Sequence, residues 1–262
     1  MRRLSLVLVF VVGVLTGCSS VSFPIDDATG QNNFGYHPLD PLPVHVGIPQ
    51  GEVLNALSDE TMRLAIGTFT QEGGLSFGPA KLGVQGNNYV VILDYIKFST
   101  DSLPVLVSSS PVDGKRVATL VSEGNEELAT NVVPVYIGVG LRLTANIYVK
   151  KGELDLSSLF ALGVAARAEQ VSGTLIIQTL GVSGQEISSL IPMPSEISES
   201  SIQNAMLALA SIKVKMYDEN TQITPRVVGV YNNLGGGQTT INGFISSLLQ
   251  RPIVFPRQPA TE

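Results

Sequence analysis

The sequence predicts an α+β fold, in which a mixed or antiparallel sheet with one very long strand packs against two or three helices. Two observations support this class. Every second residue from Val135 to Val149 is apolar, which is typical of a strand with a single buried face. Segments with helical spacing of apolar residues also alternate with strand-like segments along the chain. The long strand is expected over about 134–150, and Gly138 and Gly140 are the places where it should bend.

Several elements are predicted before the long strand. Apolar spacing predicts a helix over 53–69, and the turn residues Gly86-Asn87-Asn88 predict a hairpin between the strands on either side of them. The strand over 89–99 begins with residues that are apolar on both faces, so it is expected in the centre of the sheet. An Asp-Gly turn at 113–114 separates two further strands. The strands expected in this part are 75–85, 89–99, 105–109 and 116–121.

Helices and strands alternate after the long strand. Asp155 is the expected N-cap of the next helix, because its carboxylate can accept hydrogen bonds from free amides of the first turn. Ser200 and Gln203 have the spacing of a capping box and predict the start of a second helix. The elements expected here are a helix over 155–169, a strand over 171–182, a helix over 201–217, a strand over 223–231 and a helix over 241–249.

The prolines suggest how the chain is divided. Residues 18–50 are rich in Pro, Gly, Ser, Asn and Asp and contain no apolar period, which predicts an extended tether. Residues 51–250 are then one globular α+β domain, and 251–262 are an irregular tail with three prolines. Residues 1–17 have the features of a signal peptide, with two arginines followed by a short apolar run.

Composition excludes one class of partner. The 262-residue chain has a formal charge of −6, and loss of the signal peptide with Arg2 and Arg3 would leave −8. Proteins that bind nucleic acid carry clustered Lys and Arg, so nucleic acid is not an expected partner. The hydrophobic content of 44% is enough for a substantial core, and the single cysteine excludes an internal disulfide framework.

That cysteine ends the sequence Leu15-Thr16-Gly17-Cys18, directly after the apolar run. The four residues resemble the lipobox of bacterial lipoproteins. The resemblance implies that the Cys18 sulfur is acylated and becomes the new N-terminus, which anchors the protein to a membrane. Ser19 and Ser20 follow, and no aspartate stands at the second position. In this class that pattern implies sorting to the outer membrane, with the body facing the periplasm or the cell surface.

Residues with the potential for chemistry are few. His37 and His45 are the only histidines and both lie in the expected tether, so we assign no metal site and no serine–histidine catalytic pair. Asp94 lies in an apolar strand, and burial disfavours the charged form of a carboxyl. It is therefore the acid best placed for acid–base chemistry. The alternative is that Asp94 faces solvent, or pairs with Arg142 or Lys97.

A glycine-rich loop is the second candidate site. Gly235, Gly236 and Gly237 lie between an expected strand and an expected helix, where backbone amides could approach an anionic ligand. The loop lacks the lysine of a phosphate-binding loop. A flexible turn with Thr239 or Thr240 as the N-cap is therefore the favoured interpretation.

No residue is assigned a catalytic role and no cofactor is expected. The favoured function is a non-enzymatic binding, scaffold or assembly factor of the cell envelope, whose partners are envelope proteins or further copies of the chain, bound along a strand edge. One alternative is a subunit of an oligomeric outer-membrane pore or export channel, in which the alternating strand contacts lipid. That arrangement resembles in outline the curli-type lipoprotein secretion channels. The third hypothesis is an envelope hydrolase that uses Asp94 or glutamates in a cleft.

Overall fold

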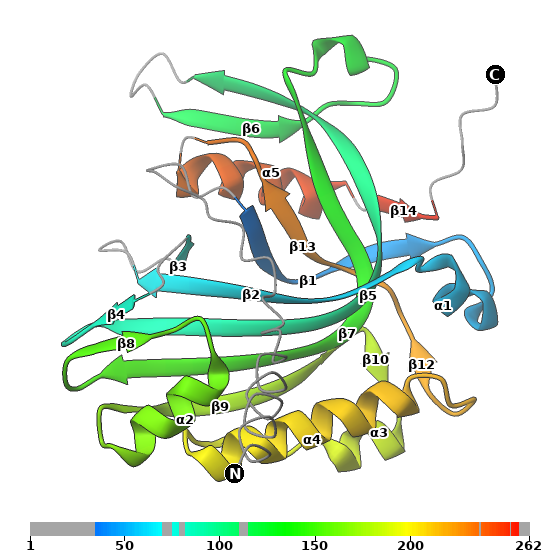
Figure 1. Ribbon diagram of the computed structural model, residues 1–262. Helices are drawn as coiled ribbons and strands as arrows, with labels where there is room; N and C mark the ends of the chain where they lie inside the picture. The colour runs from blue at the N-terminus through cyan, green and yellow to red at the C-terminus, as the bar shows by residue number, and fades with distance from the viewer. Residues whose placement is uncertain are drawn as a thin grey trace, which may run out of the picture.

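The computed structural model describes residues 35–69, 75–78, 82–109, 115–235, 237–251 and 253–256. Its strands form one large curled sheet and two small two-stranded pairs, and its helices pack beside the sheet (Figure 1). The predicted α+β class is confirmed. The main path through the large sheet runs β14-β1-β13-β7-β5-β2-β3, with β6, β9 and β11 attached to its sides.

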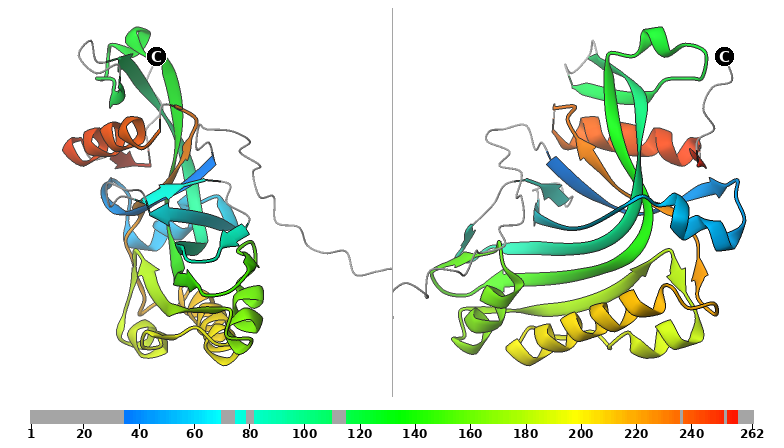
Figure 2. Two further views of the ribbon diagram at one scale, coloured as in Figure 1. Left: turned by 90° about the vertical axis from the view of Figure 1, so that its left-hand side faces the viewer. Right: turned by 45° about the vertical axis from the view of Figure 1, so that its right-hand side comes forward.

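A long antiparallel ribbon of two strands organises the fold. Strand β5 (Asn88–Ser109) pairs with β7 (Asn131–Val149) without interruption, from Asn88 opposite Tyr148 to Val105 opposite Asn131. The predicted long strand is therefore confirmed, and it begins slightly earlier than expected. Figure 2 shows this ribbon curving from one end of the molecule to the other.

The two glycines expected at a bend lie where β7 changes partner. Strand β13 (Arg226–Asn232) pairs with β7 up to Gly138, and β9 (Val171–Leu180) pairs with it from Gly140 onward. A Cβ atom on Gly138 would lie 2.3 Å from the carbonyl oxygen of Lys97, and one on Gly140 would lie 1.9 Å from that of Tyr95. Only glycine fits at such a close approach of two backbones.

Strand β5 is central, as predicted, because β2 (Asp59–Phe69) pairs with its other side. The helix predicted over 53–69 is wrong. A short 3-10 turn, η1 (Gln50–Glu52), leads into a four-residue helix, α1 (Val53–Ala56), and the rest of the segment is β2. The apolar residues of β2 contribute to cores on both faces of the sheet, so their spacing also fits a helical period.

The hairpin predicted at Gly86 is also wrong. Strand β3 (Leu75–Phe77) pairs with β2, and β4 (Leu82–Val84) pairs with β8 (Glu153–Asp155), so neither pairs with β5. The hairpin between β5 and β6 (Arg116–Leu120) is confirmed, while its Asp-Gly turn lies outside the described residues. A 3-10 turn, η2 (Glu126–Leu128), precedes β7.

Both predicted boundaries of the globular domain require correction. The last part of the expected tether forms β1 (Gly35–Val46), which is antiparallel to β13 despite three prolines. The register shifts between Pro38 and Leu42, because proline has no amide hydrogen for a regular ladder. Part of the expected tail forms β14 (Ile253–Phe255), which is parallel to the end of β1.

Three helices lie together at one end of the sheet: α2 (Leu159–Arg167), α3 (Gln185–Leu190) and α4 (Glu199–Lys215) (Figure 1). Asp155 is not an N-cap as expected. It ends β8 and accepts hydrogen bonds from Ser157, and α2 begins after Ser158. The helix α4 was predicted, but its capping box is formed by Ser198 and Ser201. Helix α3 has no counterpart among the predicted elements.

The remaining small elements complete the sheet and its cover. Strand β10 (Val182–Ser183) follows β9 in the chain and pairs with β12 (Gln222–Ile223), and β11 (Ser195–Glu196) pairs with β9. The last helix, α5 (Gln238–Gln250), is longer than the predicted 241–249 and packs against β6.

The main core lies on the face of the sheet that carries the odd-numbered residues of β7. From Val133 to Val149 each of these side chains is at most 2% exposed. Residues of α2, α4 and α5 join the same core. The other face, called the second face below, carries smaller apolar clusters with polar side chains between them. None of the helices in the described ranges is long and apolar enough to cross a membrane.

Candidate functional site

Asp94 is fully buried at the centre of the second face of the sheet. It is 0% exposed, and strand register places it between Arg63 of β2 and Arg142 of β7. Arg142 binds both of its carboxylate oxygens, from Nε to Oδ1 at 2.7 Å and from Nη2 to Oδ2 at 2.7 Å. This is the two-pronged geometry that guanidinium and carboxylate groups favour. The pairing with Arg142 was one of the alternatives left open by the sequence.

Strand β1 supplies a third member of this network. The Tyr36 hydroxyl donates a hydrogen bond to Oδ2 of Asp94 at 2.5 Å. Burial, followed by the negative charge of Asp94, raises the pKa of Tyr36 well above its usual value. Tyr36 therefore stays a neutral donor. Asp94 consequently has hydrogen-bond donors on both oxygens.

Arg142 also holds the backbone of two other strands. Its Nη1 donates to the carbonyl oxygen of Leu39 at 2.8 Å, and its Nη2 donates to that of Val228 at 3.1 Å. Burial alone would lower the pKa of Arg142, but its hydrogen bonds and charge interaction with Asp94 raise it overall. One guanidinium thus connects β7 with β1, β5 and β13.

Arg63, which lies opposite Asp94 on β2, is surrounded by aromatic rings. The guanidinium carbon of Arg63 is 4.5 Å from the ring centre of Tyr136, 5.5 Å from that of Tyr36 and 5.9 Å from that of Phe98. These distances allow cation–π attraction with each ring. The buried Nε of Arg63 has no hydrogen-bond partner in the described part of the chain. The network around Asp94 therefore contains one charge-balanced pair and one additional positive group.

This arrangement is suited to holding strands together and not to proton transfer. A general acid or base needs a carboxyl that can reach a substrate. Both oxygens of Asp94 are engaged by Arg142 and Tyr36 and are closed to solvent. Among the described residues no group of three or more His, Cys, Asp or Glu is arranged to hold a metal ion.

The glycine-rich loop forms the turn from β13 into α5. Gly235 and Gly237 have φ angles of 66° and 76°, values that favour glycine, and Gly236 lies outside the described residues. Gly237 is the N-cap, so the expectation of Thr239 or Thr240 in that place is wrong. Thr240 lies inside the helix, where its hydroxyl donates to the carbonyl oxygen of Arg116.

Helix α5 covers the edge of β6 that does not pair with β5. Besides the Thr240 contact, Ser247 accepts a hydrogen bond from the amide of Leu120, and Arg251 donates to the carbonyl oxygen of Val121. A Cβ on Gly243 would lie 2.9 Å from the carbonyl oxygen of Ala118, so glycine allows the helix to come this close. The glycine loop thus positions a helix that covers backbone groups of an edge strand.

The remaining candidate residues are Cys18, His37 and His45. Cys18 lies outside the described residues. His37 is not in a solvated tether as expected. It is buried in β1 against the ring of Phe77, and burial lowers its pKa from 6.5 to about 4. His45 is exposed near the end of β1.

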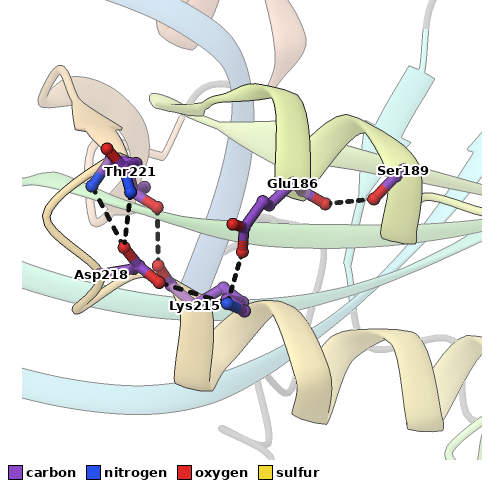
Figure 3. Close-up of polar contacts among 6 residues, drawn as sticks. Glu186, Ser189, Lys215, Asp218 and Thr221 are labelled. Atoms are coloured by element: carbon purple, nitrogen blue, oxygen red, sulfur yellow. Dashed lines mark hydrogen bonds and ion pairs between the residues drawn. The ribbon is translucent and has the colours of Figure 1, made fainter.

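A polar cluster at the junction of α3 and α4 was not predicted. Figure 3 shows Lys215 between Glu186 of α3 and Asp218, and Thr221 donates a hydrogen bond to the carbonyl oxygen of Lys215. Hydrogen bonds to Glu186 and Asp218 raise the pKa of Lys215. The side chains are partly exposed, so this cluster ends α4 and joins it to α3 without forming a closed site.

A trough of about 390 Å³ crosses four strands at one end of the second face. We name it the four-strand trough. Its floor is backbone at positions such as Gly173, where a Cβ would lie 1.9 Å from the carbonyl oxygen of Asn146. The sequence shows its polar residues only as the solvent-facing half of alternating strands, so strand register is needed to bring them together. The side chains that define it are Phe69, Asn88, Asn146, Tyr148, Ser172 and Thr174.

No protein-family model, curated protein or solved structure matches this chain.

Proposed function

We propose that the protein is a lipid-anchored lipoprotein of the outer membrane that binds a component of the cell envelope without chemical turnover. The observation that carries the proposal is Leu15-Thr16-Gly17-Cys18 directly after a short apolar run. An acylated Cys18 would hold the body at the bilayer, facing the periplasm or the cell surface. Binding partners are expected among envelope components or further copies of the chain.

The geometry of the second face supports binding over hydrolysis. The hydrolase hypothesis rests on Asp94 as a reactive acid, and this carboxylate is fully engaged by Arg142 and Tyr36. The four-strand trough, by contrast, has the volume of a small-molecule site and is open at the surface.

The burial of β7 supports the same choice over an oligomeric pore. The pore hypothesis was motivated by the alternating apolar residues of this strand. Its apolar side chains from Val133 to Val149 are covered by the chain's own core, which includes residues of α2 and α4. The alternation is therefore explained by internal packing.

The experiment is expression of the full chain in a Gram-negative host, followed by mass spectrometry of its N-terminal peptide and separation of the two membranes. We expect an acylated peptide that begins at Cys18, in the outer-membrane fraction. Cys18→Ser is the matched control and should give an unacylated product. An intact leader, or a free Cys18 thiol in a soluble product of the unaltered chain, would overturn the anchor.

A further inference from the structure

The four-strand trough has a regular construction that points to a ligand. Asn88 of β5 lies opposite Tyr148 of β7, which lies opposite Ser172 of β9. Two residues along, Asn146 lies opposite Thr174. Thr68 pairs with Tyr89, so the register places Phe69 beside Asn88 and completes a row across four strands.

The polar side chains of the trough are free to bind. Asn88, Asn146, Ser172 and Thr174 have no side-chain hydrogen bond to any part of the described chain. Amide and hydroxyl groups both donate and accept hydrogen bonds. Four such groups in one hollow of about 390 Å³ therefore offer a mixed set of donors and acceptors to a ligand.

Two aromatic rings border these polar groups. Phe69 is 53% exposed and Tyr148 is 42% exposed, although aromatic side chains of this size usually bury most of their surface. The residues described as lining the trough carry no charge. The site consequently selects an uncharged ligand with one flat apolar face and polar groups around its rim.

We infer that the four-strand trough binds a neutral oligosaccharide. A pyranose ring has a face of C–H groups that packs on an aromatic ring, and hydroxyls at its rim that exchange hydrogen bonds with amides and hydroxyls. A trough that is open along the row would accept consecutive sugars of a linear chain. The inference goes beyond the proposed function and does not depend on acylation of Cys18.

An extended peptide is the less favoured ligand of this trough. Peptides that join a sheet use the free backbone groups of an edge strand. Here β5 is paired with both β2 and β7, and β7 is paired with both β5 and β9. The trough therefore offers side chains and rings in place of a backbone ladder.

The test is a titration of the purified full chain, in a detergent without a sugar headgroup, with the β-1,4-linked hexamers of N-acetylglucosamine and of glucose. The chain contains no tryptophan, so its fluorescence comes from seven tyrosines, and a change on titration that is lost in Tyr148→Ser reports on that ring. Calorimetry is the second measurement. We expect saturable binding of at least one hexamer, weakened about tenfold by Tyr148→Ser and by Asn146→Leu.

The controls use exposed aromatic residues elsewhere on the surface. Phe160→Ala on α2 and Tyr217→Ser after α4 remove rings that are 59% and 56% exposed, and both variants should bind like the unaltered chain. Circular dichroism before titration confirms that each variant is folded. Absence of binding by both hexamers up to millimolar concentration overturns the inference. So does equal binding by the Tyr148→Ser variant, or tighter binding of the peptide Gly-Ser-Gly-Ser-Gly-Ser with an acetylated and an amidated end.

Discussion

At the scale of single residues, the pair of Asp94 and Arg142 stands out because both of its charges are buried within the sheet. Removing two charges from water is costly, and good geometry with additional hydrogen bonds is needed to offset the cost. Arg142 meets this condition with contacts to Asp94, Leu39 and Val228. The pair therefore fixes how four strands are arranged.

Arg142→Met is expected to destabilise the fold by about 3–5 kcal/mol, because it leaves the Asp94 charge buried without its partner. Chemical denaturation measures the change. Asp94→Leu combined with Arg142→Met should recover part of the loss, since no lone charge then remains. Lys213→Met is the control: it breaks the exposed pair with Glu60 and should cost less than about 1 kcal/mol. Equal costs for the two single variants would contradict the structural role of the buried pair.

His37 gives the fold a dependence on pH. Its pKa is lowered from 6.5 to about 4 by burial, so the unfolded chain takes up a proton before the folded chain does. Above pH 6.5, neutral His37 makes its full contribution to the free energy of unfolding. This free energy falls by about 3 kcal/mol in total as the pH falls toward 4. Denaturation of His37→Leu at several pH values should show that its free energy of unfolding falls less steeply over this range than that of the unaltered chain. The exposed His45→Leu variant should keep the original decline, and an unchanged slope in His37→Leu would exclude this origin.

The surroundings of these residues could be predicted from the sequence only in part. The burial of Asp94 was predictable from its apolar strand, but the choice of Arg142 over Lys97 depends on strand register. The rings around Arg63 come from three other strands, β1, β5 and β7. No local pattern brings such residues together, so the surroundings of this arginine could not be predicted.

At the scale of elements, local signals were strongest where the apolar residues lie on one side of an element, even though the middle of β7 is buried on both sides. Strand β7 and helix α4 were predicted well because each has one apolar side. Strand β2 was mistaken for a helix because residues on both of its sides are apolar. Strand β1 was missed because its prolines suggest a tether, while its pairing depends on contacts with β13 and β14, which are distant in sequence.

Ser198→Ala is expected to destabilise the protein by about 1 kcal/mol, because the Ser198 hydroxyl accepts the amide of Ser201 at the start of α4. Thermal or chemical denaturation measures the loss. Ser200→Ala tests the cap position that the sequence favoured and should have less than about half of this effect. A larger loss for Ser200→Ala would restore the original assignment.

At the scale of the whole molecule, the curved ribbon of β5 and β7 joins two parts of the sheet (Figure 2). One part contains β9 and the helices α2 to α4, and the other contains β1, β13 and α5. The contact of the two backbones at Gly138 and Gly140 lies between these parts. The fold class and the bend were predictable, whereas the order of strands was not, because β13 and β9 share one side of the same strand.

Gly140→Ala is expected to destabilise the protein by more than about 2 kcal/mol, or to prevent folding, because its Cβ would lie 1.9 Å from the carbonyl oxygen of Tyr95. Gly51→Ala is the matched control, since a Cβ there has no atom within 4 Å and should change stability by less than about 1 kcal/mol. Yield, circular dichroism and denaturation compare the two variants. Normal stability of Gly140→Ala would contradict the close approach of the strands.

The inclusion of β1 in the sheet shortens the linker expected between the proposed lipid anchor at Cys18 and the folded domain. Residues 18–34, seventeen in all, precede Gly35, where β1 begins. The tether expected from the sequence, 18–50, has thirty-three residues. Fully stretched, seventeen residues span at most about 60 Å. The proposed anchor would therefore keep Gly35 within about 60 Å of the membrane, roughly half the reach expected for a linker that extends to residue 50.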